Sequence, residues 1–376
     1  MDKHINIVAF DNPYPPVYGG AIDVFYKLAA LSKKGLKIHL HIFINSNLQI
    51  EPLSKYCEEI YIYERKLGFS NQLSLLPFII KSRSSLQLNK RLSENNFPIL
   101  FEGLHSTHAL ICDNKLFERS IIRHHNIEHE YYKGLFNSDK HILRKIFFFL
   151  ESIKLKKILK KINQSAYNFA ISESDAIILK DNYFKNITIL PPFHSSTLTD
   201  TSFNDQPFIL YHGNLNVAEN IMAVDYLLKE IFIDKKKKYV VAGLNNNIKF
   251  KKKFTSLPNI ELIENPSTKK IDDLIKTARV IVLPTFQSTG IKLKLIDSLY
   301  NGNHVIANQQ MVQGFPLPEI ISVASNPDEI INLINEKIKS PLSIEEKNNR
   351  LIQLNRFFDN DQNATRIINI INQLLR

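Results

Sequence analysis

Short apolar segments alternate with longer amphipathic segments along most of the chain. The apolar segment Ile5–Phe10 stops at the turn residues Asp11-Asn12-Pro13, a helical pattern covers Ala21–Lys34, and a second apolar segment follows at Lys37–Ile44. Strands that alternate with helices in this way form parallel sheets with helices on both faces. The pattern therefore predicts the α/β class and a doubly wound sheet.

The alternation continues to about residue 307, with one interruption. Pro191–Gln206 is polar and rich in turn residues, which is typical of a linker. We therefore predict a first domain at residues 1–195, a second at 207–358, and a helix at 359–376 that crosses back to the first domain. Helices are predicted at Glu219–Ile231 and Gly290–Tyr300 of the second domain. The remaining predicted strands are Pro98–Glu102, Ser120–His124, Tyr167–Ile171, Ile187–Leu190, Phe208–His212, Tyr239–Gly243, Asn259–Ile263, Val280–Leu283 and His304–Ala307.

Composition and charge narrow the class of protein. The 376 residues are 44% hydrophobic and 23% charged, as in ordinary folded proteins. No apolar run approaches the ~18 residues of a membrane-spanning helix. Two cysteines, Cys57 and Cys112, cannot form a disulfide framework, and the N-terminal residues do not resemble a secretory signal, so we expect a cytoplasmic location. The net charge of +11 indicates an anionic partner. The alternative is a base-composition effect, because proteins encoded by AT-rich genomes tend to be rich in lysine and asparagine.

Two loops in the first domain carry candidate ligand contacts. Gly19 and Gly20 lie where a helix is expected to begin, so their backbone N–H groups can approach an anion or a sugar closely. A loop of ordinary tight turns is the alternative. His105 directly follows a predicted strand, where it can contact a sugar hydroxyl, although a lone histidine is more often structural.

Titratable and aromatic residues are densest in Arg123–Tyr132, again after a strand. Three histidines and two glutamates raise the question of a metal. However, His125 and His129 do not form the HExxH pattern, and no later cluster completes a tetrahedral site. We therefore expect no metal here. A hydroxyl-rich ligand is expected to contact Arg123, His125, Asn126 and Glu128 instead.

The second domain has its own strand-to-helix turn at Gly213 and Asn214. Such a turn has room for a phosphate, although the segment lacks both the GxGxxG and the GK[ST] pattern. An ordinary connection between a strand and a helix is the alternative.

The most specific segment of the chain is Leu283–Gly302, in which a predicted strand leads through a loop of small residues onto a predicted helix. Thr289 and Gly290 would expose backbone donors at the start of the predicted helix, and Lys294 and Asp297 share a helical face because they are three residues apart. A cation beside backbone donors suits a diphosphate, and a carboxylate one turn later suits a ribose diol. An amphipathic helix with exposed lysines is the alternative.

Five segments together resemble the glycosyltransferases of the two-Rossmann-domain GT-B fold, in particular the family-4, retaining, nucleotide-sugar-dependent group. The segments are Pro15–Gly20, Arg123–Glu128, Ile171–Asp175, Gly213–Asn220 and Thr289–Gly302. The last is similar to the GxRxKxxEAxxxG signature, with Lys294 at its lysine, Asp297 at its ribose-binding glutamate and Lys292 where arginine is usual. The resemblance implies two Rossmann-like domains that face each other across a cleft, an N-terminal one for the acceptor and a C-terminal one for the nucleotide sugar.

The resemblance also implies a reaction. A sugar would pass from a nucleotide-diphosphate donor, with retention and without an essential metal or other cofactor, to a glycan or lipid-linked acceptor of surface polysaccharide or glycoconjugate synthesis. His105 and Lys294 would be catalytic. The acceptor or sugar side would hold Arg123, His125, Asn126 and Glu128. The donor would contact Gly19, Gly20, Gly213, Asn214, Thr289, Gly290, Lys292, Lys294 and Asp297.

One departure from the family pattern leaves alternatives open. Thr289 stands where the family has the first acid of an E-x7-E motif, so Gln287 or Ser288 would have to supply its hexose contact. A non-catalytic sugar-binding relative and a nucleotide-sugar 2-epimerase of the same fold are therefore alternative functions. A nucleic-acid partner is not expected, because the chain has no zinc-finger, RNP or helix-turn-helix signature.

A basic segment, Lys140–Lys161, indicates a second anionic partner. It carries eight Lys or Arg residues and one acid, Glu151. Its apolar residues recur at helical spacing, which predicts either a helix packed on its own domain or an amphipathic helix on an anionic leaflet. The second interpretation places the protein peripherally at the inner face of the cytoplasmic membrane. The two apolar sets are Leu143, Ile146, Leu150 and Ile153, and Leu155, Ile158, Leu159 and Ile162.

Overall fold

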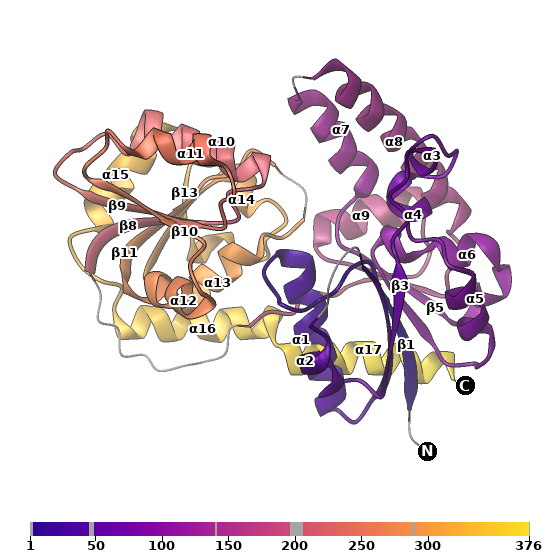
Figure 1. Ribbon diagram of the computed structural model, residues 1–376. Coiled ribbons are helices and arrows are strands. Elements are labelled where there is room, and N and C mark those ends of the chain that lie inside the picture. Colours follow the sequence, from indigo (N-terminus) through magenta and orange to yellow (C-terminus); the bar gives the residue numbers. More distant parts are fainter. Residues whose placement is uncertain (1–2, 45–48, 140, 196–205, 288–289, 376) are drawn as a thin grey trace. The chain divides into compact units, whose positions relative to one another are not determined.

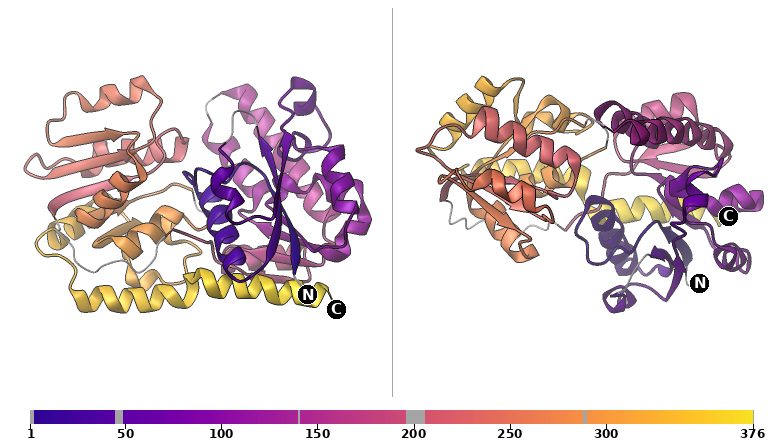
Figure 2. Two further views of the ribbon diagram at one scale, coloured as in Figure 1. Left: turned by 60° about the horizontal axis from the view of Figure 1, so that its bottom comes forward. Right: turned by 45° about the horizontal axis from the view of Figure 1, so that its top comes forward.

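The computed structural model describes residues 3–44, 49–139, 141–195, 206–287 and 290–375. Its contacts divide the chain into an N-terminal unit, Met1–Phe193 with Phe358–Arg376, and a C-terminal unit, His194–Phe357. Each unit has one parallel sheet with helices on both faces (Figures 1 and 2). The prediction of an α/β protein with two Rossmann-like domains is confirmed.

The N-terminal unit contains a seven-stranded sheet in the order β3-β2-β1-β4-β5-β6-β7. The chain begins in the interior strand β1, proceeds outward to β3, and then crosses to β4 on the other side of β1, as in a doubly wound fold. The strands are β1 (His4–Ala9), β2 (Lys37–Ile44), β3 (Glu59–Glu64), β4 (Ile99–Glu102), β5 (Ser120–His124), β6 (Tyr167–Ala170) and β7 (Ile187–Ile189).

Both faces of this sheet are buried by helices. In β4, Ile99 and Phe101 belong to one apolar cluster and Leu100 to another, because successive side chains of a strand point to opposite faces. Helices α4, α5, α6, α8 and α9 contribute to the first cluster, and α1, α2 and α17 to the second. The helices are α1 (Gly19–Lys33), α2 (Glu51–Ser54), α3 (Phe69–Gln72), α4 (Phe78–Lys81), α5 (Leu86–Ser93), α6 (His108–Cys112), α7 (Glu128–Ser138), α8 (Ile142–Lys161), α9 (Glu173–Asn182) and α17 (Asn360–Leu374).

The C-terminal unit repeats the plan with six parallel strands in the order β10-β9-β8-β11-β12-β13. The strands are β8 (Gln206–His212), β9 (Lys238–Gly243), β10 (Ile260–Glu264), β11 (Ala278–Leu283), β12 (His304–Asn308) and β13 (Ser322–Ala324). The helices are α10 (Ala218–Tyr226), which continues as a π-helical turn (Leu227–Ile231), α11 (Ile248–Lys251), α12 (Thr268–Thr277), α13 (Leu293–Asn301), α14 (Gln309–Val312), α15 (Pro327–Lys337) and α16 (Ile344–Phe358).

The structure adds two strands to those predicted and changes the start of one predicted helix. Strands β3 and β13 were not predicted, because β3 is a half-exposed edge strand and β13 has only three residues. The predicted helix Gly290–Tyr300 is wrong at its start, since α13 begins at Leu293. Gly290 has a φ of 69°, and this left-handed conformation is incompatible with a right-handed helical turn.

The chain order reverses at one point in each sheet. The first two strands on either side of this switch point are β1 and β4 in the N-terminal unit, and β8 and β11 in the C-terminal unit. Doubly wound sheets bind ligands beyond the carboxyl ends of the strands at this point. No helix of the described residues combines the length and the hydropathy needed to cross a bilayer.

Candidate functional site

The predicted donor contacts of the C-terminal unit gather at the switch point between β8 and β11. The Gly213-Asn214 turn follows β8 directly, and the loop after β11 leads into α13, which carries Lys294 and Asp297. A side-chain contact connects α13 to the end of β8. Oγ of Ser298, one turn after Lys294, lies 2.7 Å from Nε2 of His212. Burial lowers the pKa of His212 to about 3, so this contact is between neutral groups at ordinary pH.

Lys294 is a partly buried cation held by neutral oxygens. Its Nζ donates to Oδ1 of Asn220 at 2.8 Å and to the hydroxyl of Tyr211 at 3.3 Å, and it lies 4.9 Å from the centre of the Tyr211 ring. Burial lowers the pKa of Lys294 to about 8. Within the described part of the chain, no carboxylate is at ion-pair distance from this ammonium group, although the more distant charge of Glu219 acts to raise its pKa, so an anionic ligand would still add attraction.

Asn220 and Tyr211 position this lysine, and sequence reasoning did not assign them a role. The Tyr211 hydroxyl donates to Oδ1 of Asn220 at 3.1 Å, and Nδ2 of Asn220 donates to the backbone oxygen of Asn214 at 2.9 Å. The amide of Asn220 therefore connects Lys294 to the predicted phosphate turn. The sequence did contain one signal for a role of Asn220, which is its place in the first turn of the helix that follows the glycine turn.

Gly213 and Gly243 bring two chain segments into close approach at this turn. A Cβ atom on Gly243 would lie 1.7 Å from the carbonyl oxygen of Gly213, which is sterically impossible, and a Cβ on Gly213 would lie 3.3 Å from Cγ of Asn220. The turn can therefore approach β9 and Asn220 only because both positions lack a side chain. Gly243, at the end of β9, is a second residue that sequence reasoning did not select.

The other predicted donor contacts lie around the start of α13. Lys292 is the residue before the helix and donates to the backbone oxygen of Gly290 at 3.4 Å. Asp297 is half-buried and accepts from Nδ2 of Asn301 at 2.8 Å. Thr289 and Ser288 lie outside the described residues.

The N-terminal unit places three predicted residues around Phe10, which directly follows β1. Gly20 belongs to the first turn of α1, and a Cβ on it would lie 2.6 Å from the Phe10 ring, so only glycine fits there. The ring centroids of His105 and His125 lie 5.1 and 5.5 Å from that of Phe10. Gly19 begins α1, whose N-terminus has no side-chain cap. These loops follow β1, β4 and β5, as expected for a switch-point site.

His105 and Glu128 face each other beside this ring. Nδ1 of His105 lies 3.9 Å from Oε1 of Glu128, and none of the residues that the structure describes hydrogen-bonds to this nitrogen. Burial, with Arg83 as the nearest cation, holds the pKa of His105 well below its usual value, so the imidazole is neutral. Burial raises the pKa of Glu128 to about 7, against the lowering effects of Arg83 and of the hydrogen bond from Asn126. A neutral imidazole can exchange hydrogen bonds with a sugar hydroxyl.

Arg83 is a buried cation of this site that sequence reasoning missed. Its guanidinium donates to the backbone oxygens of Phe10 at 2.5 Å and Ile79 at 2.6 Å, and burial lowers its pKa to about 9. Arg83 comes from the chain after α4, which no motif connects with the strand-end loops.

Arg123 and His125 belong to a buried network of charges. Arg123 donates to Asp23 through Nε at 2.9 Å and to the backbone oxygen of Leu190 at 2.7 Å. Lys27 donates to Glu102 at 2.6 Å and to Asp23 at 3.4 Å. Asp23 also accepts from the backbone N–H of Phe193 at 2.7 Å. The side chain of Arg123 is fully buried, so its contacts are within the fold, and its predicted contact with a sugar stays a prediction.

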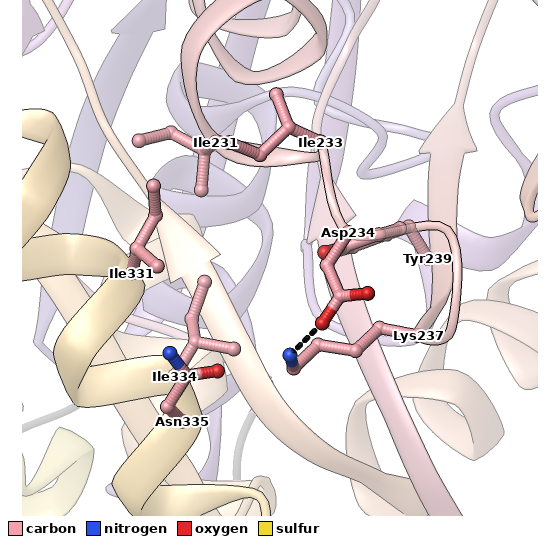
Figure 3. Close-up of a pocket in the computed structure, with 8 residues that line it drawn as sticks. All are labelled: Ile231, Ile233, Asp234, Lys237, Tyr239, Ile331, Ile334 and Asn335. Atoms are coloured by element: carbon pink, nitrogen blue, oxygen red, sulfur yellow. Dashed lines mark hydrogen bonds and ion pairs between the residues drawn. The ribbon is translucent and has the colours of Figure 1, made fainter.

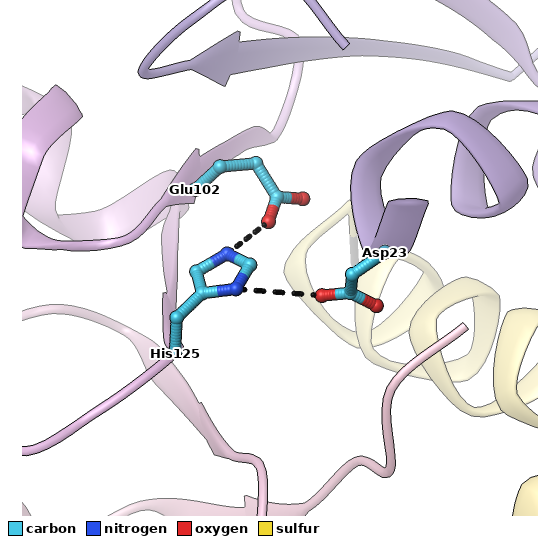
Figure 4. Close-up of side chains that lie close together, drawn as sticks. All are labelled: Asp23, Glu102 and His125. Carbon is cyan, nitrogen blue, oxygen red and sulfur yellow. Dashed lines mark hydrogen bonds and ion pairs between the residues drawn. The ribbon is translucent and has the colours of Figure 1, made fainter. Parts of the chain in front are cut away.

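His125 bridges the two carboxylates of this network, as Figure 4 shows. Its Nε2 lies 2.9 Å from Glu102 and its Nδ1 3.5 Å from Asp23. These three residues have the donor atoms for a cation, but Lys27 and Arg123 already balance the two carboxylates. Burial alone would raise the pKa of Asp23, but Arg123 and Lys27 outweigh it and lower the pKa. The prediction that no metal is needed stays a prediction.

A separate cavity lies beside the amino-terminal end of β9, away from the turn at Gly213. It has a volume of about 280 Å³ and contains none of the predicted site residues (Figure 3). Asp234 and Lys237 form an ion pair at its edge. Its walls are formed by Ile231, Ile233, Asp234, Lys237, Tyr239, Ile331, Ile334 and Asn335.

Comparisons with known proteins connect this fold to sugar transfer. No protein-family model matches the chain. A Klebsiella pneumoniae protein, named "Uncharacterized 44.6 kDa protein in cps region", is 28% identical over 333 residues, which cover 81% of this chain and 82% of that protein.

Several solved structures are similar over nearly the whole chain. WaaG, a glycosyltransferase involved in lipopolysaccharide biosynthesis, has a TM-score of 0.69 at 10% identity and covers 98% of this chain and 99% of its own. TarM has a TM-score of 0.68 at 11% identity and covers 99% of both chains. Anabaena Alr3699/HepE, solved with UDP and glucose, has a TM-score of 0.65 at 11% identity and covers 99% of this chain and 100% of its own. The chain therefore has the GT-B fold of group 1 glycosyltransferases, and the resemblance found in the sequence is confirmed for the fold.

Proposed function

We propose that the protein is a glycosyltransferase that moves a sugar from a nucleotide-diphosphate donor to a glycan or lipid-linked saccharide acceptor. The observation that carries the proposal is Lys294, a partly buried ammonium group with neutral hydrogen-bond partners beside a glycine turn at the switch point. The leaving group of such a donor is a nucleoside diphosphate, which gains negative charge in the transition state. A preorganised cation at this position stabilises that charge.

The proposed roles follow the two units. In the C-terminal unit, Lys294 neutralises the diphosphate, Asp297 contacts the ribose, and the backbone at Gly213, Asn214 and Gly290 supplies donors. In the N-terminal unit, the neutral imidazole of His105 contacts a hydroxyl of the transferred sugar, with Glu128 beside it. The proposed reaction is a hexosyl transfer with retention and needs no metal or other cofactor.

The proposed setting is bacterial surface polysaccharide or glycoconjugate synthesis in the cytoplasm. The similarity to WaaG, which is involved in lipopolysaccharide biosynthesis, supports this setting. The relative from the cps region is consistent with it. A lipid-linked acceptor would place the reaction at the inner face of the cytoplasmic membrane, where the protein would be peripheral.

The test is a screen for release of the nucleoside diphosphate. The protein is incubated with a panel of nucleotide sugars, with and without a crude lipid-linked acceptor fraction, and Lys294→Met is the matched control. One donor is expected to give acceptor-dependent release that the variant lacks. Acceptor-independent conversion of one nucleotide sugar into its epimer would indicate the 2-epimerase. Binding of a nucleotide sugar without release under either condition would indicate a sugar-binding relative.

A further inference from the structure

Exposed large hydrophobic side chains of the N-terminal unit gather in two segments. Segment 67–75, which includes α3, exposes four of them, and α8 exposes six. Leu75 is 95% exposed and Leu143 is 79% exposed. Apolar surface of this extent on a folded protein marks an interaction site. The residues are Leu67, Phe69, Leu73 and Leu75, and Ile142, Leu143, Ile146, Phe149, Leu150 and Ile153.

The two segments belong to one region of the surface. Segment 67–75 leads directly into α4, whose Phe78 contacts α8 twice. The backbone N–H of Phe78 donates to Oε2 of Glu151 at 2.6 Å, and its ring lies 6.5 Å from that of Phe147. Leu75 is three residues from Phe78, so the chain keeps their Cα atoms within about 11 Å of each other. The segment is thereby held near the middle of α8.

Helix α8 is divided along its length. Its second half is buried through Leu155, Ile158 and Leu159, as expected for a helix packed on its own domain. The other apolar set, which includes Leu143 and Ile146, is exposed. Helix α7 runs beside α8 (Figure 1) and covers a different face, with rings of Tyr132 and Phe148 6.0 Å apart. Both interpretations of the basic segment therefore have a physical basis, each in one part of the helix.

The outward face of α8 changes from apolar to basic along the helix. Residues at intervals of three and four lie on one face, so the exposed apolar stripe continues into exposed lysines. The one acid of the helix, Glu151, is not on this face: it is fully buried and pairs with Lys154 at 2.8 Å. The stripe consists of Ile142, Leu143, Ile146, Leu150 and Ile153, followed by Lys157, Lys160 and Lys161.

The apolar segment has the same charge pattern. Exposed or half-exposed cations border it at Arg65, Lys66 and Lys81, and one exposed acid, Glu64, precedes them. Exposed apolar side chains bordered by lysine and arginine match a bilayer surface, which offers hydrocarbon below anionic head groups. A soluble protein partner would more often meet this region with carboxylates than with a wide apolar layer.

We infer that segment 67–75 and the first half of α8 insert together into an anionic lipid bilayer, while the lysines at the end of α8 contact the head groups. Docking would then have two parts, an electrostatic one that salt weakens and an apolar one that salt does not remove. The inference rests on the proposed function only for its purpose, which is to bring the enzyme to a lipid-linked acceptor. Docking itself can be measured without turnover.

The absence of tryptophan from the chain makes a direct test available. Leu75→Trp and Leu143→Trp each introduce a single fluorophore into the proposed surface. The control is Ile344→Trp, at a position of the C-terminal unit that is 65% exposed. Vesicles of phosphatidylglycerol and phosphatidylcholine are added to the full-length variants, some with lipids brominated on their acyl chains.

The two surface probes are expected to shift to shorter emission wavelengths and to be quenched by brominated lipid, while the control probe changes in neither respect. Equal behaviour of all three probes would overturn the inference, as would binding without any shift. A shift that grows with protein concentration in the absence of vesicles would instead identify a second copy of the chain as the occupant.

Substitutions separate the two parts of docking. Leu75→Glu removes one inserted side chain and is expected to weaken vesicle binding about tenfold or more. The triple change of Lys157, Lys160 and Lys161 to Glu should abolish the preference for anionic over neutral vesicles. Both variants must retain the wild-type thermal unfolding midpoint, and the nucleotide-sugar screen in detergent should be unaffected. Wild-type vesicle affinity of Leu75→Glu would refute insertion whether or not the protein transfers sugar.

Discussion

Each unit places a lysine near the switch point of its sheet, but the two lysines have different partners. Lys27 lies between Glu102 and Asp23, at 2.6 and 3.4 Å, in a network whose charges balance within the protein. Among the described residues, the hydrogen bonds of the Lys294 ammonium group go to the neutral oxygens of Asn220 and Tyr211. A buried charge that is compensated internally stabilises the fold, whereas one that is not compensated leaves attraction for a ligand. Burial alone therefore does not indicate function; the charge balance around the buried group does.

The largest effect is expected when a charge is removed from the balanced network of the N-terminal unit, and it is an effect on stability. Arg123→Met leaves Asp23 without its main partner and should lower the free energy of unfolding by about 3–5 kcal/mol, measured by urea denaturation. The double variant Arg123→Met/Asp23→Asn removes both charges and should recover part of the loss. If the single variant loses less than about 1 kcal/mol, the network is not what holds these elements together.

Lys294→Met should have the opposite effect, with a large loss of activity and little change in stability. We expect it to lose about 2–4 kcal/mol of transition-state stabilisation, measured as kcat/KM for the donor, because it removes one preorganised cation. Its free energy of unfolding should be unchanged or higher, since no carboxylate loses a partner. A kcat/KM within about threefold of the wild type would exclude the diphosphate role.

The pH dependence of diphosphate binding sharpens the same distinction. In the free protein the pKa of Lys294 is about 8, and a bound diphosphate favours the charged form and raises it. Above pH 8 the affinity should therefore fall about tenfold per unit until the pKa of the complex is reached, whereas below about pH 6 protonation of the terminal phosphate of the ligand weakens binding separately. Isothermal titration with UDP, GDP and ADP at several pH values measures this slope, and Lys294→Met is expected to remove it. A slope that persists in the variant would assign the titration to another group.

Asp297 should give the smallest effect of the four. Asp297→Asn weakens one contact to the ribose, and this contact is present in both the ground state and the transition state. The donor KM should therefore rise by the factor that corresponds to a loss of about 0.5–1.5 kcal/mol of binding free energy. The kcat should stay unchanged. A collapse of kcat at constant KM would instead place Asp297 at the reacting centre.

The fold was more accessible from the sequence than the site. Apolar segments at strand length predicted the interior strands, because burial on both sheet faces makes them almost uniformly hydrophobic. Edge strand β3 was not predicted, since it is half-exposed and lacks a uniformly hydrophobic segment. His105 was selectable because it closely follows a strand, and Lys294 because it lies in the first turn of a helix that follows a strand and a small-residue loop, whereas Arg83 reaches Phe10 from a distant segment and its contact depends on tertiary packing alone.

The buried network could have been suspected from one local signal. Asp23 and Lys27 are four residues apart and share the inward face of α1, where two charges are unusual. No local pattern could show that Glu102 of β4 and Arg123 of β5 complete the charge balance of Asp23 and Lys27. The sequence prediction of Arg123 as a sugar contact considered its residue type without these partners.

Helix α17 has a consequence for how the protein is made. It packs beside α1 (Figure 1) and buries Ile367, Ile370 and Ile371 in the core of the N-terminal unit, although the whole C-terminal unit precedes it in the chain. Domains generally fold as units while they emerge from the ribosome. Here the unit that is synthesised first is expected to wait, with the apolar face of α1 uncovered, until about 160 further residues have been translated at 5–20 residues per second. Its exposure to chaperones and proteases during that interval of roughly ten to thirty seconds is therefore set by the translation of the other domain.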